Sequence, residues 1–533
     1  MPLRSLTSNL KAGFNKWRLA FLIFATIYAV FLTIDLGGMT LQWDETSHLN
    51  GGLLLLHGNF NQYTQSNMFY PPFVDVVIAA YFRIAGASLF TARLVPLTFA
   101  VLSVWVVFEF SYRTYGPKTA LLASILLSVM PGFVWLARLT LLETALVFFF
   151  SASLMLFYAW LHKQDSKLLV LSGVALGLGF LVKYQILVAV IVMLASIFLL
   201  FRGHIIAKLY RFLLMILTAA LIVLPWIIIS YQVYSSGMLN QWIYALEIGN
   251  PQKALYSARF GPFSLPFFYL IEMTWPYGVV HPISIFIYIF GLLGLSLFLW
   301  RRKPADKFLL VWFFVVYVFF SFLGNRQWRY VMPIFPVLAV SAASLITFAG
   351  AKAEKAWKNA NVHLNKKRAA QLGAACLIGV VAFSVAYSCA DAYNWVAKDY
   401  AFKVPTEEAT GYVGARLKPN ESLLILCALN VFSQDIVQFY LNANETKPNS
   451  LLQYPEYPVD TYTIDFNVTA LVDLSSERHV KYLLLFEYGG TYPYFNSNLT
   501  EQAVYNILIT SQRFSFETAV GEYPTRIFIL TFH

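Results

Sequence analysis

The chain has 533 residues, of which 59% are hydrophobic, 17% aromatic and 12% charged, and its mean hydropathy is +0.62. Soluble proteins carry about 25% charged residues, so this composition excludes an ordinary soluble protein and indicates one that crosses a membrane several times. The net charge of +11 does not indicate nucleic-acid binding, because Lys and Arg gather in short loops between hydrophobic runs, and three cysteines are too few for a disulfide framework.

The first hydrophobic run, Leu19 to Leu36, follows a basic segment with Arg4, Lys11, Lys16 and Arg18. No small-residue cleavage site comes after the run, so we expect an uncleaved transmembrane helix and not a signal peptide. The basic flank predicts a cytoplasmic N-terminus, which places the next polar segment on the outer side of the membrane.

Runs of about 20 apolar residues predict about eleven membrane-spanning helices. After the first, they are expected at residues 92–112, 119–135, 143–161, 168–182, 184–201, 212–230, 281–300, 308–323, 331–350 and 369–387. The apolar segment Phe73 to Ala87 contains Asp75 and Arg83, which predicts an amphipathic helix along the outer interface within the first outer loop, residues 37–91.

The loops between these helices support one orientation in the membrane. Five loops predicted inside all carry Lys or Arg, whereas the long outer loop, residues 231–280, is mixed in composition. The inside loops are residues 112–118, 162–167, 202–211, 301–303 and 352–368. An odd number of spans predicts an extracytoplasmic C-terminus in a multi-pass protein of a cell membrane or endomembrane.

The sequence divides into a transmembrane domain, residues 1–391, and an extracytoplasmic α/β domain, residues 392–533. In the second domain, strands are predicted at 423–427, 482–486 and 526–532, and helices at 407–417, 433–442 and 500–512. All four Asn-x-Ser/Thr sequons lie in this domain, at Asn420, Asn444, Asn467 and Asn498. They give modest support to an outer location.

Two adjacent carboxylates, Asp44 and Glu45, stand just beyond the first predicted helix. The simpler interpretation is structural: Asp44 caps a helix running from Glu45 to Leu56. The functional interpretation is that one carboxylate accepts the proton of an incoming hydroxyl as a general base. Ionisable residues at the outer ends of other helices favour the functional interpretation.

Arg138 and Glu143 lie in a short outer loop with apolar flanks, where charges are costly unless they are paired or functional. A local ion pair between them is the structural alternative. Lys183 is flanked by apolar runs on both sides, so it either reaches the interface by extending its side chain or binds a phosphate.

Arg326 and Arg329 break the positive-inside pattern, because they lie in a loop predicted outside. Arginine binds phosphate oxygens through two parallel hydrogen bonds, so at least one of them is expected to bind phosphate. Six weaker candidates are interpreted as surface or interface residues: Arg93, His48, Glu247, Lys253, Arg259 and Glu272.

No cofactor is firmly implied by the sequence. Asp44 and His48 are four residues apart and could share a helix face, but two ligands do not make a metal site, so a divalent metal has little support. The chain has no Gly-rich nucleotide loop, and a nucleotide donor therefore has no support.

Several short motifs follow one another along the chain: Trp43-Asp44-Glu45 with His48 and Gly51-Gly52, Gly58-Asn59, Tyr70-Pro71-Pro72, Ala92-Arg93-Leu94, Arg138 to Glu143, Lys183, and Arg329-Tyr330 with Pro333. Taken in this order, they resemble the C-type membrane glycosyltransferases of the GT-C fold. The similarity is strongest to the dolichyl-phosphate-mannose protein mannosyltransferases and the lipid A aminoarabinose transferases, and it covers roughly Arg18 to Gly350.

The resemblance implies transfer of a sugar from a polyprenyl-phosphate carrier to an acceptor on the outer face, with inversion at the anomeric carbon. It implies that Asp44 is the general base and that Glu45 supports or orients the substrate. The residues implied to bind substrate or carrier phosphate are Tyr70, Arg138, Glu143, Lys183, Arg326, Arg329 and Tyr330. Tyr70 departs from the family pattern, because relatives often have Lys or His there and a phenol donates only a neutral hydrogen bond.

The expected partners are a polyprenyl-phosphate-linked sugar, a protein, lipid or glycan acceptor, and the lipid bilayer. Three alternatives stay open at this stage. An oligosaccharyltransferase would call for more acidic metal ligands, a transporter or flippase of lipid-linked sugars would call for charges in mid-membrane and for repeats, and a structural scaffold leaves the outer charges unexplained.

Overall fold

The computed structural model describes residues 15–66, 70–200, 205–238, 240, 264–274, 281–323, 326–359, 364–426, 431–446, 448–455, 464–487, 489–492, 495 and 499–533. These form two compact units, each discontinuous in sequence. The helical unit comprises Met1–Ile34, Thr64–Val74 and Arg93–Val396, and the mixed unit comprises Asp35–Tyr63, Asp75–Ala92 and Ala397–His533.

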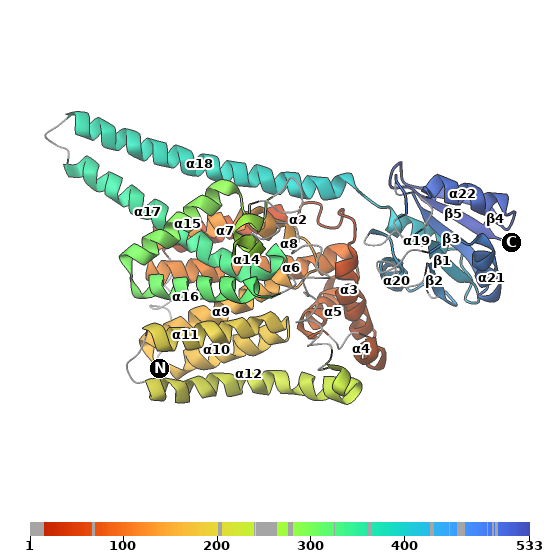
Figure 1. The fold of residues 1–533 in the computed structure, drawn as a ribbon, viewed down its shortest axis with the longest axis horizontal. Helices are drawn as coiled ribbons and strands as arrows, with labels where there is room; N and C mark the ends of the chain where they lie inside the picture. The colour runs from red at the N-terminus through yellow and green to blue at the C-terminus, as the bar shows by residue number, and fades with distance from the viewer. Residues whose placement is uncertain are drawn as a thin grey trace. The chain divides into compact units, whose positions relative to one another are not determined.

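The helical unit is a bundle of apolar helices (Figure 1). Among the described residues, seven helical stretches are long and apolar enough to cross a membrane, and four shorter apolar helices accompany them. The protein is therefore a multi-pass membrane protein, as predicted, although the count of eleven spans stays a prediction. The helices are α2 (Lys16–Thr33), α6 (Leu89–Thr114), α7 (Pro117–Ser128), α8 (Pro131–Leu136), α9 (Glu143–Lys163), α10 (Ser166–Phe180), α11 (Leu187–Leu200), α12 (Ile205–Tyr234), α14 (Ser264–Glu272), α15 (Ile285–Arg301), α16 (Pro304–Ser321), α17 (Phe335–Asn359) and α18 (Leu364–Ala401).

Prolines change two of the predicted helices. The helix expected at residues 119–135 is split into α7 and α8. Pro131 disfavours helical backbone at the preceding residue, Met130, which is extended. The helix expected at residues 331–350 begins instead as a 3₁₀ segment, η3 (Trp328–Ile334), which contains Pro333 and leads into α17. Both corrections arise from local backbone restriction inside apolar sequence.

The basic segment predicted as an inside loop at residues 352–368 is mostly helical. It is formed by the end of α17 and the start of α18. Several predicted features lie outside the described residues: most of the loop at 231–280 with Glu247, Lys253 and Arg259, and the sequon at Asn498.

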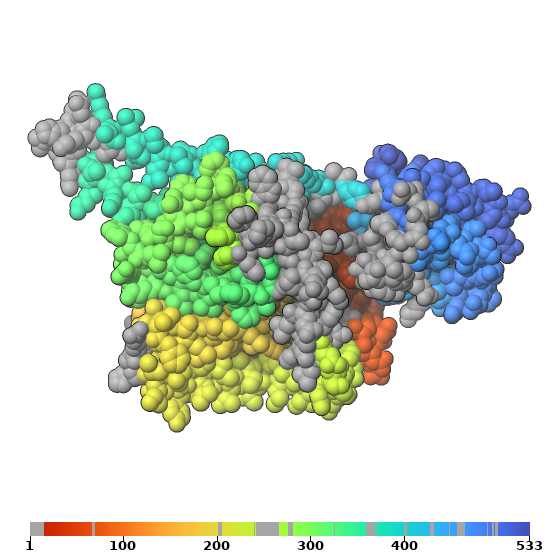
Figure 2. All heavy atoms as spheres, in the orientation of Figure 1, coloured from red at the N-terminus to blue at the C-terminus, as the bar shows by residue number. Residues whose placement is uncertain are grey.

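Helices of the bundle differ in how much apolar surface they bury. The apolar stretch of η3 and α17 is 83% buried, whereas those of α12 and α18 are only 28% and 11% buried. Figure 2 shows α12 along the lower surface of the helical unit, where the side chains of Leu217 and Leu221 are exposed. In a membrane protein such faces contact lipid, so burial within the protein is not needed to stabilise them.

The C-terminal part of the mixed unit is an α/β domain, as predicted. Its five-stranded sheet has the order β2-β1-β3-β5-β4, with β2, β1 and β3 parallel and β5 and β4 antiparallel. The strands are β1 (Ser422–Leu426), β2 (Leu451–Tyr454), β3 (Val480–Phe486), β4 (Phe514–Val520) and β5 (Ile527–Phe532). The helices are α19 (Thr406–Gly414), α20 (Gln434–Ala443), α21 (Val468–Glu477) and α22 (Glu501–Thr510).

The sequence analysis missed two strands and a helix of this domain. β2 and β4 lie at the two edges of the sheet, where Glu517 and other polar residues interrupt the apolar pattern. The central strands β1 and β3 are apolar and almost wholly buried, which explains why they were predicted. The missed helix is α21.

The first outer loop packs with the C-terminal domain inside the mixed unit. This loop folds into α3 (Trp43–Leu56), α4 (Phe60–Ser66) and α5 (Phe73–Ala85). Helix α3 contacts α20, and the Thr40 hydroxyl donates to the Phe402 carbonyl at 2.6 Å. The division drawn from sequence assigned this loop to the transmembrane domain, whereas most of it belongs to the mixed unit by packing.

Candidate functional site

Asp44 and Glu45 have different environments at the start of α3. The helix begins at Trp43, and the Gln42 amide donates to the Glu45 carboxylate at 3.2 Å. Glu45 is fully buried and Asp44 is exposed. The structural interpretation, in which Asp44 caps a helix that starts at Glu45, was therefore wrong. The carboxylate that accepts a hydrogen bond from the backbone before the helix is that of Glu45. A carboxylate with access to solvent is left beside a structural one.

A buried polar network, which the sequence analysis missed, lies one helical turn further along α3. His48 Nδ1 is 2.8 Å from Asp75 Oδ1, and the Tyr63 hydroxyl donates to Asp75 Oδ2 at 3.0 Å. Asp75 is 1% exposed, so this residue of the predicted interfacial helix does not face water. The sequence did contain one signal of this network: Asp75 is a carboxylate in an otherwise apolar stretch, and a buried carboxylate needs hydrogen-bond partners.

Close packing of α3 against α5 brings His48 within hydrogen-bonding distance of Asp75. A Cβ atom on Gly52 would lie 2.5 Å from Ile78 Cγ2, a distance that no side chain tolerates without movement. Glycine therefore lets the two helices approach until His48 reaches Asp75.

The C-terminal domain holds the start and the middle of α3. Trp43 Nε1 donates to Asp435 Oδ2 at 3.0 Å, and Asn50 Nδ2 donates to the Asp435 carbonyl at 3.1 Å. Asp435 stands in the first turn of α20, so one residue of the domain binds α3 on both sides of Asp44.

Four of the predicted binding residues meet in the helical unit. Lys183 Nζ lies 3.0 Å from Glu143 Oε1, and Arg329 Nε lies 3.8 Å from the same oxygen. Lys183 and Arg329 also lie over the Tyr330 ring, at 5.3 and 5.9 Å from its centroid. We call Glu143, Lys183, Arg329 and Tyr330 the basic cluster.

The ends of three elements build the basic cluster. Glu143 is the first residue of α9, Lys183 follows the end of α10, and Arg329 lies in η3. A Cβ atom on Gly179 would overlap Ile186 Cδ1 and lie 2.8 Å from Phe149 Cβ. The small residue thus lets the end of α10 approach α9, which brings Lys183 to Glu143.

Three other predicted residues of the helical unit have different surroundings. Arg138 donates to the carbonyls of Leu32 and Ile34, both at 2.8 Å, and so caps the end of α2. Arg326 is buried and donates to the Leu323 carbonyl at 2.8 Å, and burial lowers the pKa of its guanidinium. Tyr70 is exposed, at 42% of its surface.

Three weaker candidates are more buried than predicted. His48, Arg93 and Glu272 were interpreted as surface or interface residues, but His48 is only 5% exposed and the other two are completely buried. Arg93 and Glu272 lie within apolar helices, so hydropathy alone did not distinguish a buried charge from one at the membrane boundary.

An aromatic cluster stands next to Arg329. The ring centroid of Trp328 lies 6.2 Å from that of Trp135 and 5.6 Å from that of Trp395. The rings of Trp135 and Trp395 stack with their centroids 5.1 Å apart. Trp395 belongs to α18, so stacking fixes the end of that helix beside η3. These rings come from three distant segments, and no sequence signal connects them.

The chemistry of the two sites follows from their charges. In the basic cluster, two cations share one carboxylate, which leaves one positive charge, and Lys183 and Arg329 keep 20% and 23% of their side-chain surface exposed. Such a group is suited to an anion such as a phosphate. In the mixed unit, exposed Asp44 is suited to accept a proton. Among the described residues, no group of three or more His, Cys, Asp or Glu side chains could hold a metal ion.

Known proteins match this chain in sequence. Residues 70–229 match the family model described as dolichyl-phosphate-mannose-protein mannosyltransferase. The undecaprenyl phosphate-alpha-4-amino-4-deoxy-L-arabinose arabinosyl transferase of Aeromonas hydrophila is 24% identical over 320 residues, covering 57% of this chain and 55% of the relative. The chain thus spans about half the length of the curated relatives it matches.

Solved structures match nearly the whole chain. ArnT from Cupriavidus metallidurans in the apo state has a TM-score of 0.58 at 15% identity, covering 96% of this chain and 97% of that one. The structure of that protein bound to undecaprenyl phosphate has a TM-score of 0.57. The archaeal oligosaccharyltransferase AglB from Archaeoglobus fulgidus, in complex with an inhibitory peptide and a dolichol-phosphate, has a TM-score of 0.58 at 14% identity, covering 96% of this chain and 74% of that one.

At these identities the structural matches show that the chain is a membrane protein with the GT-C fold of ArnT and AglB. The sequence matches show that part of the chain is similar to mannosyl and arabinosyl transferases.

Proposed function

We propose that this protein transfers a sugar from a polyprenyl-phosphate-linked donor to an acceptor on the extracytoplasmic face of the membrane. The names of the relatives support this donor class, since one is an undecaprenyl phosphate sugar transferase and two solved structures contain a polyprenyl phosphate. The acceptor is a hydroxyl or amine group of a protein, lipid or glycan.

The proposed reaction is a direct displacement that inverts the anomeric carbon. The acceptor atom forms a bond to the anomeric carbon while the bond from that carbon to the carrier phosphate oxygen breaks. The acceptor proton goes to the Asp44 carboxylate, and the bonding electron pair leaves with the polyprenyl phosphate. Asp44 suits this role because it is exposed, whereas its neighbour Glu45 is buried at a helix start.

The observation that carries the proposal is the basic cluster. Glu143 holds Lys183 at 3.0 Å and Arg329 at 3.8 Å, so both cations are oriented before a ligand arrives. A leaving phosphate gains negative charge as the glycosidic bond breaks, and oriented cations stabilise that charge. The proposal names no cofactor: Lys183 and Arg329 place positive charge at the proposed phosphate site, and the weakly supported divalent metal is tested with a chelator.

We further propose a cytoplasmic N-terminus and an extracytoplasmic mixed unit. Segments predicted inside lie together in the helical unit: Tyr115 donates to Asp306 at 2.8 Å, and Arg301 also binds Asp306. This grouping supports the positive-inside assignment.

The test is release of label from radiolabelled polyprenyl-phosphate sugars by the purified full chain in lipid, comparing wild type with Asp44→Asn. The substitution removes the base with almost no change in volume, so we expect transfer to fall by roughly 10² to 10⁴-fold. Binding of the carrier should be retained. A chelator should leave wild-type release unchanged.

Unchanged turnover in Asp44→Asn would exclude Asp44 as the base. Absence of release from every donor, even with a crude acceptor extract present, would instead favour the transporter or flippase alternative, which a flipping assay would then examine.

A further inference from the structure

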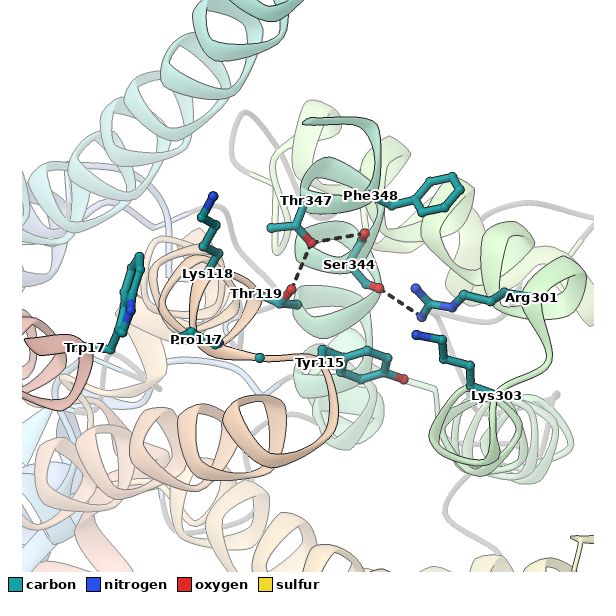
Figure 3. Close-up of a pocket in the computed structure, with 11 residues that line it drawn as sticks. Trp17, Tyr115, Pro117, Lys118, Thr119, Arg301, Lys303, Ser344, Thr347 and Phe348 are labelled. Atoms are coloured by element: carbon teal, nitrogen blue, oxygen red, sulfur yellow. Dashed lines mark hydrogen bonds between the residues drawn. The ribbon is translucent and has the colours of Figure 1, made fainter. Parts of the chain in front are cut away.

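A cavity of about 500 Å³ lies in the helical unit, where α7 and α16 begin and α15 ends (Figure 3). None of the residues of the basic cluster lines it. Its inner wall is formed by Ser344 and Thr347, which lie roughly three turns along α17 from the end of η3. The cavity is therefore separate from the proposed phosphate site.

The lining of this cavity is basic. Among the described residues that line it, Lys118, Arg301 and Lys303 are basic and none is acidic. Arg301 donates two hydrogen bonds to the Asp306 carboxylate, from Nη2 to Oδ1 at 2.6 Å and from Nε to Oδ2 at 2.8 Å, and this carboxylate balances the charge of Arg301. Lys118 and Lys303 add two further positive charges along the wall, and Lys118 also interacts electrostatically with the exposed Glu354 of α17.

Hydroxyl groups lie between the two lysines, as Figure 3 shows. Thr119 Oγ1 and Thr347 Oγ1 are 2.9 Å apart, and the Ser344 hydroxyl accepts a hydrogen bond from Arg301 at 3.0 Å. Hydroxyls flanked by cations match the oxygen atoms of a phosphodiester, which accept hydrogen bonds and carry negative charge.

The residues around the cavity are of the types that gather at the edge of a membrane. Trp17 and Phe348 line it, and Lys352 lies 4.8 Å from the centre of the Phe348 ring. Lys352 also lies over Trp300, which is 69% exposed. Tryptophan and lysine gather at the level of lipid headgroups, and the exposed apolar side chain of Ile23 on α2 offers contact for acyl chains.

We propose that this cavity binds the phosphate-bearing headgroup of an anionic phospholipid. Lys118 and Lys303 attract the phosphate, the Ser344 hydroxyl, which accepts from Arg301, donates to one of its oxygens, and the acyl chains stay in the bilayer. Basic pockets between transmembrane helices commonly bind such headgroups. The inference does not depend on the proposed sugar transfer, because it concerns a different cavity and a different ligand.

The experiment is native mass spectrometry of the detergent-purified full chain with dioleoyl phosphatidylglycerol, dioleoyl phosphatidylcholine or inorganic phosphate. The double variant Lys118→Gln/Lys303→Gln removes the two charges of the cavity. Lys163→Gln/Lys167→Gln removes two exposed charges from another predicted inside loop and is the matched control.

We expect phosphatidylglycerol to bind the wild type more tightly than phosphatidylcholine. The cavity variant should lose about tenfold or more of its phosphatidylglycerol affinity, and the control variant less than twofold. The variant Lys118→Arg/Lys303→Arg should keep the affinity, because it keeps both charges.

Three results would overturn the proposal. Equal losses in the cavity and control variants would show attraction to overall charge, and equal binding of the two lipids would exclude a charge-selective headgroup site. Lysine-dependent binding of inorganic phosphate that displaces phosphatidylglycerol would assign the cavity to a free anion.

Discussion

At the scale of single residues, two neighbouring carboxylates divide into a structural and an accessible group. Glu45 accepts from the Gln42 amide and is fully buried, whereas Asp44 is exposed in the same helical turn. A helix advances by about 100° per residue, so consecutive side chains necessarily face different surroundings. Chemical similarity between the two residues therefore does not imply the same role.

Replacement of Glu45 tests this division. Glu45→Ala removes the acceptor of the Gln42 amide at the start of α3, and we expect the unfolding free energy to fall by about 1 to 2 kcal/mol. Asp44→Ala should change it less, because its side chain is exposed. Thermal unfolding of the purified variants in detergent measures both, and a larger loss in Asp44→Ala would contradict the structural role of Glu45.

Arg329 is the residue on which phosphate binding by the basic cluster is most directly tested. Arg329→Ala removes one of two cations beside Glu143, and we expect carrier binding to weaken by roughly tenfold or more. The control is Arg302→Ala, which removes an exposed arginine in a loop predicted inside. Titration with polyprenyl phosphate compares them, and equal effects would remove Arg329 from the site.

At the scale of elements, close approach at glycine decides which side chains can meet. Gly179 lets the end of α10 contact α9, and the Lys183 amide donates to the Gly179 carbonyl at 2.9 Å. The position of Lys183 thus depends on a residue that itself carries no functional group.

Gly179→Ala should disturb this packing. The new methyl group would overlap Ile186 and crowd Phe149 Cβ, so we expect a loss of about 1 to 3 kcal/mol in stability and weaker carrier binding. Gly379→Ala is the matched control, since nothing lies within 4 Å of a Cβ atom at that position in α18. Thermal unfolding and carrier titration are measured on both variants; equal stability and binding would contradict the packing argument.

At the scale of the whole molecule, the C-terminal domain is linked to the helix that carries Asp44. The mixed unit joins residues 35–63 to residues 397–533, and Asp435 binds Trp43 and Asn50. The domain therefore stabilises α3, in addition to any part it has in acceptor binding.

Asp435→Ala tests this link. It removes the acceptor of Trp43 Nε1, so we expect the free energy of unfolding to fall by about 1 kcal/mol. Backbone hydrogen exchange in residues 43–56 should become faster. Asp473→Ala on α21, where the aspartate is exposed, is the control. Exchange in α3 measured by mass spectrometry distinguishes the two, and unchanged exchange in Asp435→Ala would show that the domain does not hold the helix.

Sequence pattern alone predicted that the protein has many apolar membrane helices, and it predicted the strands β1, β3 and β5. Both are local properties: an apolar run long enough to cross a bilayer, or a short buried strand, is complete within its own segment. The local pattern did not reveal β2 and β4, because edge strands are only partly buried and their pairing with a neighbour defines them.

The candidate residues were also identified from sequence, because charges near apolar helix ends are costly and stand out. Their partners were decided only by tertiary structure. His48 and Asp75 are 27 residues apart, Lys183 and Glu143 are 40 apart, and Trp43 and Asp435 are 392 apart. The types and positions of the charges follow from the sequence itself, whereas their pairing requires helices to pack closely enough for distant side chains to touch.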